Sequence, residues 1–240
     1  MKLLCFDTTA KTATAAVVTE GKVLAESSVT IGLTHSQTLM PLTDGMMKAA
    51  GLTLDDIDLV AVSHGPGSFT GLRIGIGTVK GICQGSSKKC IGISTLEALA
   101  YGFEGLDVLV CPVMDARCNQ VYTALFEGRN NLTGGINRLW NDIALSIEDL
   151  GKNLMQTRLP VMLTGDGAEL VYKALSEKFP MLRLASPGMR LQRAANVGFA
   201  ALEHLKTEEP ISPDLLMPQY LRLPQAEREL LAKQQAQSAK

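Results

Sequence analysis

The chain has 240 residues, of which 46% are hydrophobic and 20% are charged, a balance typical of globular proteins. Its 23 basic and 24 acidic residues give a net charge of −1, and without a cluster of lysines and arginines we exclude unaided tight binding to nucleic acid. No apolar run approaches the ~20 residues of a membrane span. Five cysteines without a CxxC pair and no signal-peptide pattern predict a reducing, cytoplasmic setting.

The first half of the chain predicts three strands followed by alternating helices and strands. An apolar run over residues 3–9 ends in a polar tip, and residues 13–30 form a hairpin that turns at Glu20-Gly21. The elements expected next are helix 34–50, strand 57–67, helix 69–85, strand 88–94 and helix 94–103, whose start carries Ser94 and Glu97 as a capping box.

The second half repeats this opening. An apolar run ends at Asp115 and the following strand closes at Gly128, 13 residues later, as Asp7 and Gly21 lie 14 residues apart. Helix 146–156, strand 160–168, helix 169–179 and helix 192–206 follow. Internal duplication explains the repeat, with chance similarity of two three-stranded starts as the alternative.

Two such halves predict an α/β protein of the actin-like ATPase (ASKHA) fold, with two duplicated βββαβαβα lobes facing each other across a nucleotide cleft. We expect the boundary near Glu104-Gly105. This places an N-terminal lobe with partner-binding helices at 1–104, a C-terminal lobe at 105–224 and a polar tail at 225–240.

Residues at the strand ends are candidates for a vestigial nucleotide site in this cleft. Hydroxyls and backbone N–H groups of a hairpin turn can bind phosphate, and a carboxylate can hold Mg²⁺ through water. Ordinary Asx and tight turns are the alternative explanation. The candidates are Asp7, Thr8, Thr9, Asp115, Gly165, Asp166 and Gly167.

The glycine-rich stretch GPGSFTGLRIGIG, residues 65–77, matches no common catalytic motif. It lacks the GK[ST] of a P-loop, the GxGxxG spacing and the G-x-S-x-G elbow. Helical glycines each cost up to ~1 kcal/mol relative to alanine, and here Gly71, Gly75, Gly77 and Gly81 share one helix. Close approach of another backbone, either within the chain or from a partner, accounts for them.

Helix 34–50 should begin at a capping box of Thr34 and Gln37 and end before Gly51. Its apolar residues form one stripe at helical spacing, which suits either the core or an adaptable partner surface. With residues of the next helix, the candidate contact set for a partner is Leu39, Leu42, Met46, Met47, Ala50, Gly71, Leu72, Gly75, Thr78, Val79 and Ile82.

His35 lies at the start of this helix without a metal-binding partner. Four residues later, where a second histidine would complete a pair on one helix face, the chain has Leu39. His64 and His204 also lack nearby ligands in sequence, so we predict no metal site. Counting residues leaves a Ser/His/Asp triad open, but no local signature supports one. The roles of His64, Arg73 and Arg222 stay open.

Five stretches together resemble the TsaB family, formerly called YeaZ. They are DTT at residues 7–9, HSQTLMPL at 35–42, GPGSFTGLR at 65–73, MDARCNQVY at 114–122 and PQYLR at 218–222. TsaB proteins are accessory proteins of bacterial threonylcarbamoyladenosine (t6A) synthesis and catalytically silent relatives of TsaD. The resemblance implies the two-lobed actin-like fold.

The resemblance also implies partners. TsaD carries an HxxxH metal pair and transfers threonylcarbamoyl from threonylcarbamoyl-adenylate to the adenosine 3′ of the anticodon, in tRNAs that read codons beginning with A. A TsaB-like chain would bind TsaD through helices 34–50 and 69–85, with the ATPase TsaE as third member, and would self-pair when TsaD is absent. It would meet tRNA only through the complex.

The expected function is therefore a non-catalytic scaffold that binds and activates TsaD, with no required cofactor. Weak binding of ATP or ADP with Mg²⁺, between the lobes or at the partner interface, stays open. One alternative is an ATP-dependent or metallopeptidase-like enzyme that uses Asp7, Thr8 and Asp166 in its own cleft. Another is a simple homodimeric binding protein.

Overall fold

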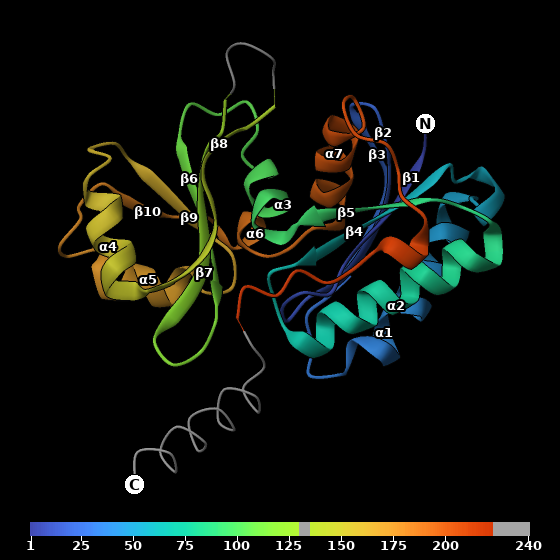
Figure 1. Ribbon diagram of the computed structural model, residues 1–240, viewed down its shortest axis with the longest axis horizontal. Helices are drawn as coiled ribbons and strands as arrows, with labels where there is room; N and C mark the ends of the chain where they lie inside the picture. The colour runs from blue at the N-terminus through green and yellow to red at the C-terminus, as the bar shows by residue number, and fades with distance from the viewer. Residues whose placement is uncertain (130–134, 223–240) are drawn as a thin grey trace, which may run out of the picture.

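A computed structural model describes residues 1–129 and 135–222, and shows two five-stranded sheets side by side (Figure 1). The first sheet has the order β3-β2-β1-β4-β5. Its strands are β1 (Leu3–Asp7), β2 (Ala13–Thr19), β3 (Lys22–Val29), β4 (Leu59–Gly65) and β5 (Cys90–Ser94). The helices of this half are α1 (His35–Ala50), the short η1 (Leu54–Asp56), α2 (Phe69–Ser86) and α3 (Thr95–Tyr101).

The second sheet has the same topology, in the order β10-β9-β6-β7-β8. Its strands are β6 (Leu109–Asp115), β7 (Gln120–Glu127), β8 (Asn137–Ser146), β9 (Val161–Thr164) and β10 (Leu182–Leu184). The remaining helices are α4 (Ile147–Met155), α5 (Ala168–Leu175), α6 (Pro187–Arg190), α7 (Ala194–His204) and η2 (Pro213–Leu215). The predicted duplication is confirmed, although strands β8 and β10 were not identified from their residues.

The central strands β1 and β6 bury nearly all their side chains because each lies between two other strands and under helices. Helices α1 and α2 cover one face of the first sheet and lie next to each other (Figure 1). On its other face lies α7, whose Gly198 packs so closely that a Cβ atom would stand 2.3 Å from Val18. Small residues of α7 therefore allow the close packing.

The chain crosses between its halves twice. Helix α3 follows the first sheet in sequence but packs on β6 and β7, and α7 follows the second sheet but packs on β1 and β2. The sequence ranges 1–104 and 105–224 therefore do not coincide with the two layered halves. The tail from 225 lies outside the described residues.

The helix ends follow local sequence. Helix α1 begins at the predicted capping box of Thr34 and Gln37, and ends at Gly51 in the left-handed conformation with φ of 67°. At α3 only half of the predicted box forms: Ser94 Oγ accepts from the Glu97 backbone N–H at 3.3 Å. The Glu97 carboxylate instead binds Arg138 and His204, so its oxygens are not used for the local cap. Among the described residues, no helix is long and apolar enough to cross a bilayer.

Candidate functional site

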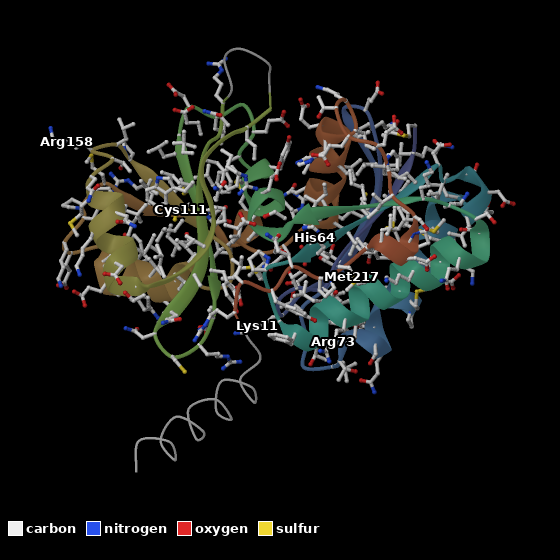
Figure 2. The ribbon with its side chains drawn as sticks, viewed as in Figure 1. Lys11, His64, Arg73, Cys111, Arg158 and Met217 are labelled. Atoms are coloured by element: carbon white, nitrogen blue, oxygen red, sulfur yellow. The ribbon has the colours of Figure 1, made fainter. Side chains whose placement is uncertain are left out.

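A cavity of about 370 Å³ lies between the two halves. The first half contributes residues of the β1–β2 turn and the start of α2, and the second half contributes the ends of β6 and β9. Figure 2 shows Lys11 between the halves. The lining residues are Thr9, Ala10, Lys11, Gly67, Ser68, Phe69, Met114, Asp115, Ala116, Arg117, Tyr122 and Asp166.

Asp7 is closed off from this cavity by its own hydrogen bonds. Its side chain is buried, accepts from the Thr9 N–H at 2.8 Å and the Thr9 hydroxyl at 2.7 Å, and accepts from Ser63 Oγ at 2.5 Å. Burial raises the pKa of Asp7, against the lowering effect of these donors. Thr8 is also buried, donating to the Gly71 carbonyl at 2.8 Å. Among the first three candidate residues, only Thr9 lines the cavity.

Asp115 and Asp166 bring two carboxyl groups to the opposite wall. Asp115 is exposed and accepts from the Arg117 N–H at 2.8 Å. One carboxyl oxygen of Asp166 is buried and has no hydrogen-bond partner. Burial, together with the charge of Asp115, raises the pKa of Asp166 to about 6. The cavity therefore holds a carboxyl group that changes protonation near neutral pH.

Gly165 and Gly167 pack closely against β6 in this wall. Gly165 has φ of +96°, and a Cβ atom there would stand 2.2 Å from the Val113 carbonyl oxygen. At Gly167 a Cβ atom would stand 2.9 Å from the Asp115 nitrogen. Both glycines are required by close contact with β6, which is the tight-turn alternative left open above.

The turn between β6 and β7 has an unusual backbone conformation. Arg117, Cys118 and Asn119 all have positive φ, at 62°, 53° and 56°, although none is glycine. Three consecutive non-glycine residues in the left-handed region make this a strained turn. In the described part of the chain, no group of three or more histidine, cysteine, aspartate or glutamate side chains is arranged to hold a metal.

His35 has a structural partner. Its Nε2 atom lies 2.7 Å from the Ala10 carbonyl oxygen, so the ring ties α1 to the β1–β2 turn. Leu39, one turn further on, is 1% exposed and belongs to the core of the first half. The place of the second histidine in a metal pair is therefore occupied by a core residue.

Most of the candidate partner contacts also lie in the core. Leu39, Met46, Met47, Leu72 and Val79 are buried between α1, α2 and the first sheet. Leu42, Thr78 and Ile82 are partly exposed, and Ala50 is exposed. Helical periodicity correctly placed Leu39, Met46 and Met47 on one face of α1, which packs on this chain's own sheet, whereas Ala50 lies outside that face.

The five glycines of α2, of which Gly85 is as open as Gly77 and Gly81, fall into two classes. A Cβ atom at Gly71 would stand 2.0 Å from the Thr8 carbonyl oxygen, and one at Gly75 would stand 2.5 Å from the Thr8 hydroxyl. These two glycines allow close contact within the chain. Gly77 and Gly81 are exposed with no atom within 4 Å of an added Cβ, and the same holds for Gly45 of α1. Gly45 could not be singled out from the sequence, because it is a single glycine outside any motif.

A segment over residues 210–222, here called the C-terminal strap, runs beside α2. Tyr220 stacks on Phe69 with ring centroids 4.2 Å apart, and its hydroxyl accepts from Arg73 Nε at 3.3 Å. Leu215 and Met217 are 68% and 66% exposed. Figure 2 shows Met217 and Arg73 on this side of the molecule. The strap therefore extends the outer surface of α2 with apolar side chains.

Two residues of open role also take part in this arrangement. The His64 carbonyl oxygen accepts from the Gln219 N–H at 2.8 Å, which fixes the strap near the end of β4. Burial lowers the pKa of the His64 ring. Arg222 donates to the Ala116 carbonyl oxygen at 2.9 Å, so the strap also contacts the second half.

Comparison with known proteins gives one consistent result. A family model described as TsaD, tRNA N6-adenosine threonylcarbamoyltransferase, matches residues 30–230. The TsaB protein of Bacillus subtilis is 28% identical over 236 residues, covering 98% of this chain and 100% of that protein. The TsaB protein of Escherichia coli is 34% identical over 133 residues, or 55% and 57% of the two chains.

Solved structures agree on the fold. YeaZ from Pseudomonas aeruginosa superposes with a TM-score of 0.71 at 23% identity, covering 92% of this chain and 99% of that chain. Component A of (R)-2-hydroxyglutaryl-CoA dehydratase from Acidaminococcus fermentans gives 0.50 at 13% identity, covering 85% and 97%. The predicted two-lobed actin-like fold and the predicted resemblance to TsaB are both confirmed.

Proposed function

Because the chain belongs to the TsaD family of tRNA N6-adenosine threonylcarbamoyltransferases, we propose that it is a non-catalytic subunit of t6A synthesis that binds and activates TsaD. In this proposal TsaD transfers the threonylcarbamoyl group from threonylcarbamoyl-adenylate to the adenosine 3′ of the anticodon. TsaE joins the pair, tRNA binds only to the complex, and a homodimer forms when TsaD is absent. The cytoplasm is the expected location.

The state of the chemical groups supports a non-catalytic role. His35 binds a backbone carbonyl oxygen, and Leu39 fills the core where a second metal ligand would stand. Asp7 and Thr8 are buried and use their polar atoms within the chain. The residues through which a relative would bind metal or phosphate are thus engaged in structure.

The outer face of α1 and α2 carries the proposal. Each exposed glycine inside a helix lowers helix stability by up to ~1 kcal/mol relative to alanine. Packing within the chain does not require glycine at positions 45, 77 or 81, which are Gly45, Gly77 and Gly81. Such glycines let a second helix approach the backbone closely. The exposed apolar side chains of Met40 on α1 and Met217 on the C-terminal strap add apolar area, as expected for a protein contact.

The test replaces the open glycines by a large charged residue. Gly77→Arg combined with Gly81→Arg should leave the fold intact, because both positions are exposed and an added Cβ atom meets no atom within 4 Å. The dissociation constant for TsaD, measured by calorimetry, should rise at least ~10-fold, with loss of t6A formation by the reconstituted complex. The matched control is Gly188→Arg on α6, which is equally exposed and equally open.

Normal TsaD binding by the folded double variant would show that this face is not the interface. Light scattering on the same proteins tests self-association, which should be lost in the double variant and kept in the control. Full t6A formation by TsaD and TsaE without this chain would contradict the activating role.

The alternative enzyme is favoured by one observation. Asp166, with an unpaired buried oxygen, lines the 370 Å³ cavity together with Lys11 and Arg117. Weak ATP or ADP binding with Mg²⁺ is compatible with the accessory role, whereas turnover is not. Titration of ATP and Mg²⁺ into the isolated chain distinguishes the accessory role from the enzyme. Micromolar binding with product release would favour the enzyme.

A further inference from the structure

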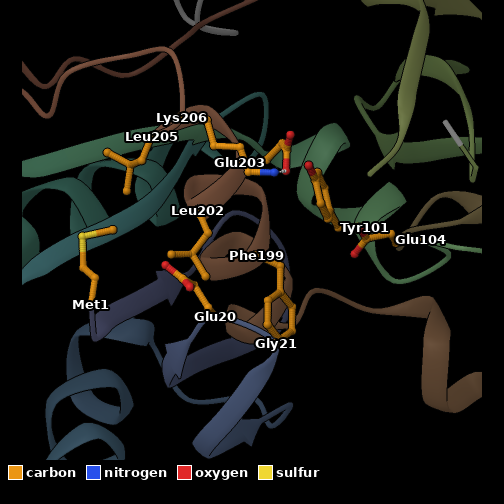
Figure 3. A pocket seen from close by; sticks show the side chains of 10 residues that line it. All are labelled: Met1, Glu20, Gly21, Tyr101, Glu104, Phe199, Leu202, Glu203, Leu205 and Lys206. Atoms are coloured by element: carbon orange, nitrogen blue, oxygen red, sulfur yellow. Dashed lines mark hydrogen bonds and ion pairs between the residues drawn. The ribbon is translucent and has the colours of Figure 1, made fainter. Parts of the chain in front are cut away.

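A second cavity, of about 530 Å³, lies where α7, the β2–β3 turn and the end of α3 meet (Figure 3). It shares no lining residue with the cavity between the halves. Its volume falls within the roughly 300–1,000 Å³ typical of small-molecule sites. Neither the proposed function nor its partners assign it a role.

The floor of this cavity is apolar. Phe199, Leu202 and Leu205 of α7 and the following turn are partly buried and pack against the core of the first half. Figure 3 shows Phe199 and Leu202 projecting from α7 into the space between Glu20 and Tyr101. Such a floor favours the hydrocarbon part of a ligand, and an aromatic ring also attracts a cation.

The rim of the cavity carries carboxylates on separate elements. Glu203 binds Lys206, with the two charged atoms 2.6 Å apart, so these charges compensate each other. Glu20 on the β2–β3 turn and Glu104 after α3 have no ion-pair or hydrogen-bond partner for their carboxylates in the described part of the chain. Two acceptors are thus available, separated by the apolar floor.

Tyr101 supplies the observation that points to a ligand. Its side chain is 7% exposed, lines the cavity, and its hydroxyl has no hydrogen-bond partner among the described residues. The hydroxyl oxygen itself is accessible from the cavity, so it is open to a hydrogen bond with a group bound there. Burial and the charges of Glu97, Glu203 and Glu104 raise the pKa of this phenol, so it remains protonated. It can therefore accept from one ligand group or donate to another.

We propose that this cavity binds a linear aliphatic diamine or polyamine. One ammonium group pairs with Glu20, another pairs with Glu104, and the methylene chain between them lies on Phe199 and Leu202. The Tyr101 hydroxyl accepts from the ammonium group near Glu104. A hydrated inorganic cation would gain nothing from the apolar floor, and a neutral apolar ligand would leave the two carboxylates unpaired.

Calorimetry on the full chain at low salt tests the site with defined probes. Pentane-1,5-diamine and spermidine should bind, pentan-1-amine should bind at least ~10-fold more weakly, and pentane-1,5-diol should not bind. Glu20→Gln combined with Glu104→Gln should weaken spermidine at least ~10-fold. The charge-matched control, Asp55→Asn combined with Glu177→Gln, changes two exposed carboxylates that lie outside the cavity lining and should leave binding unchanged.

Tyr101→Phe removes only the hydroxyl and should weaken spermidine severalfold while the protein stays folded. Equal affinity for the monoamine and the diamine would overturn the proposal, as would unchanged binding by the Glu20/Glu104 variant. Displacement of spermidine by an equal concentration of Mg²⁺ would also overturn it, because the apolar floor would then contribute nothing.

Discussion

The Nε2 atom of His204 lies 2.8 Å from the Oε1 atom of Glu97, and this contact joins α7 to α3. The other carboxylate oxygen of Glu97 accepts from Arg138 of β8 at 2.9 Å. Arg138 also binds Asp142 at 2.5 Å, and Asp142 accepts from Ser94 Oγ. A single polar network thus links elements that pack on both sheets, and we expect it to fix their relative orientation.

Alkaline pH should weaken the fold through His204. The hydrogen bond to Glu97, with the charges of Glu97 and Glu208, raises the pKa of His204 to about 9 from its ordinary value of 6.5. A group whose pKa is higher in the folded than in the unfolded state contributes its full stabilisation of the fold at pH values below its unfolded-state pKa. This contribution is lost as the pH rises through its folded-state pKa. The unfolding free energy should fall by as much as ~3 kcal/mol between pH 6.5 and 10, measured by urea unfolding.

His204→Gln separates this effect from the titration of lysines and tyrosines. The variant should be less stable than the wild type at pH 6.5 and should approach it at pH 10. An identical pH slope in both proteins would exclude His204 as the source.

Arg138 should be the most sensitive member of the network. It pairs with Glu97 and Asp142, whose side chains are only 14% and 7% exposed, and its guanidinium lies 4.6 Å from the centre of the Phe126 ring. Arg138→Ala leaves Asp142 buried without its cation and Glu97 with His204 alone, which should cost about 3 kcal/mol of unfolding free energy in urea. Lys152→Ala, which breaks only exposed pairs on α4, should not shift the unfolding midpoint. Equal shifts for the two variants would show that the network adds nothing.

The repeated strand order could be predicted because each half opens with a long apolar strand, an acidic tip and a hairpin. Strand β10 was missed because it has three residues, too few for a period to appear. The network of Glu97, Arg138 and His204 could not be predicted, since its members are 41 and 107 residues apart. Ser94 and Glu97 suggested a complete local cap, which long-range ion pairs prevented.

The candidate contact residues illustrate a different limit. A helical period shows that Leu39, Met46 and Met47 share a face, but not whether that face meets the chain's own sheet or a partner. Likewise, glycine spacing on α2 does not separate Gly71, which touches Thr8, from Gly77, which touches nothing. Only the position of β1 beside the start of α2 distinguishes them.

Gly71 and Gly77 give a matched pair of test positions within helix α2. Gly71→Ala should lower the melting temperature by several degrees, because its Cβ would stand 2.0 Å from the Thr8 carbonyl oxygen and the backbone must shift. Gly77→Ala should raise stability by up to ~1 kcal/mol, because alanine favours the helix and the added methyl meets no atom. Thermal unfolding of both variants measures the difference, and the same sign for both would contradict the packing described.

Asp166 should be a source of instability at neutral pH. Its pKa is raised by burial and by the Asp115 charge to about 6, from an ordinary value of 3.8, so the folded state resists ionisation. Such a group stabilises the folded state least when it is charged, so its contribution to the unfolding free energy falls as pH rises from about 4 to 6. Asp166→Asn should therefore raise the unfolding free energy by roughly 1–3 kcal/mol at pH 8 and have little effect at pH 4.

The Asp115 carboxylate provides the control for this prediction. Asp115→Asn keeps Asp166 but removes the neighbouring charge, so it should raise stability at pH 8 by less than Asp166→Asn does. Urea unfolding of the three proteins at pH 4, 6 and 8 tests both expectations. A pH-independent gain for Asp166→Asn would mean that the gain comes from packing or hydrogen bonding rather than from the suppressed ionisation of Asp166.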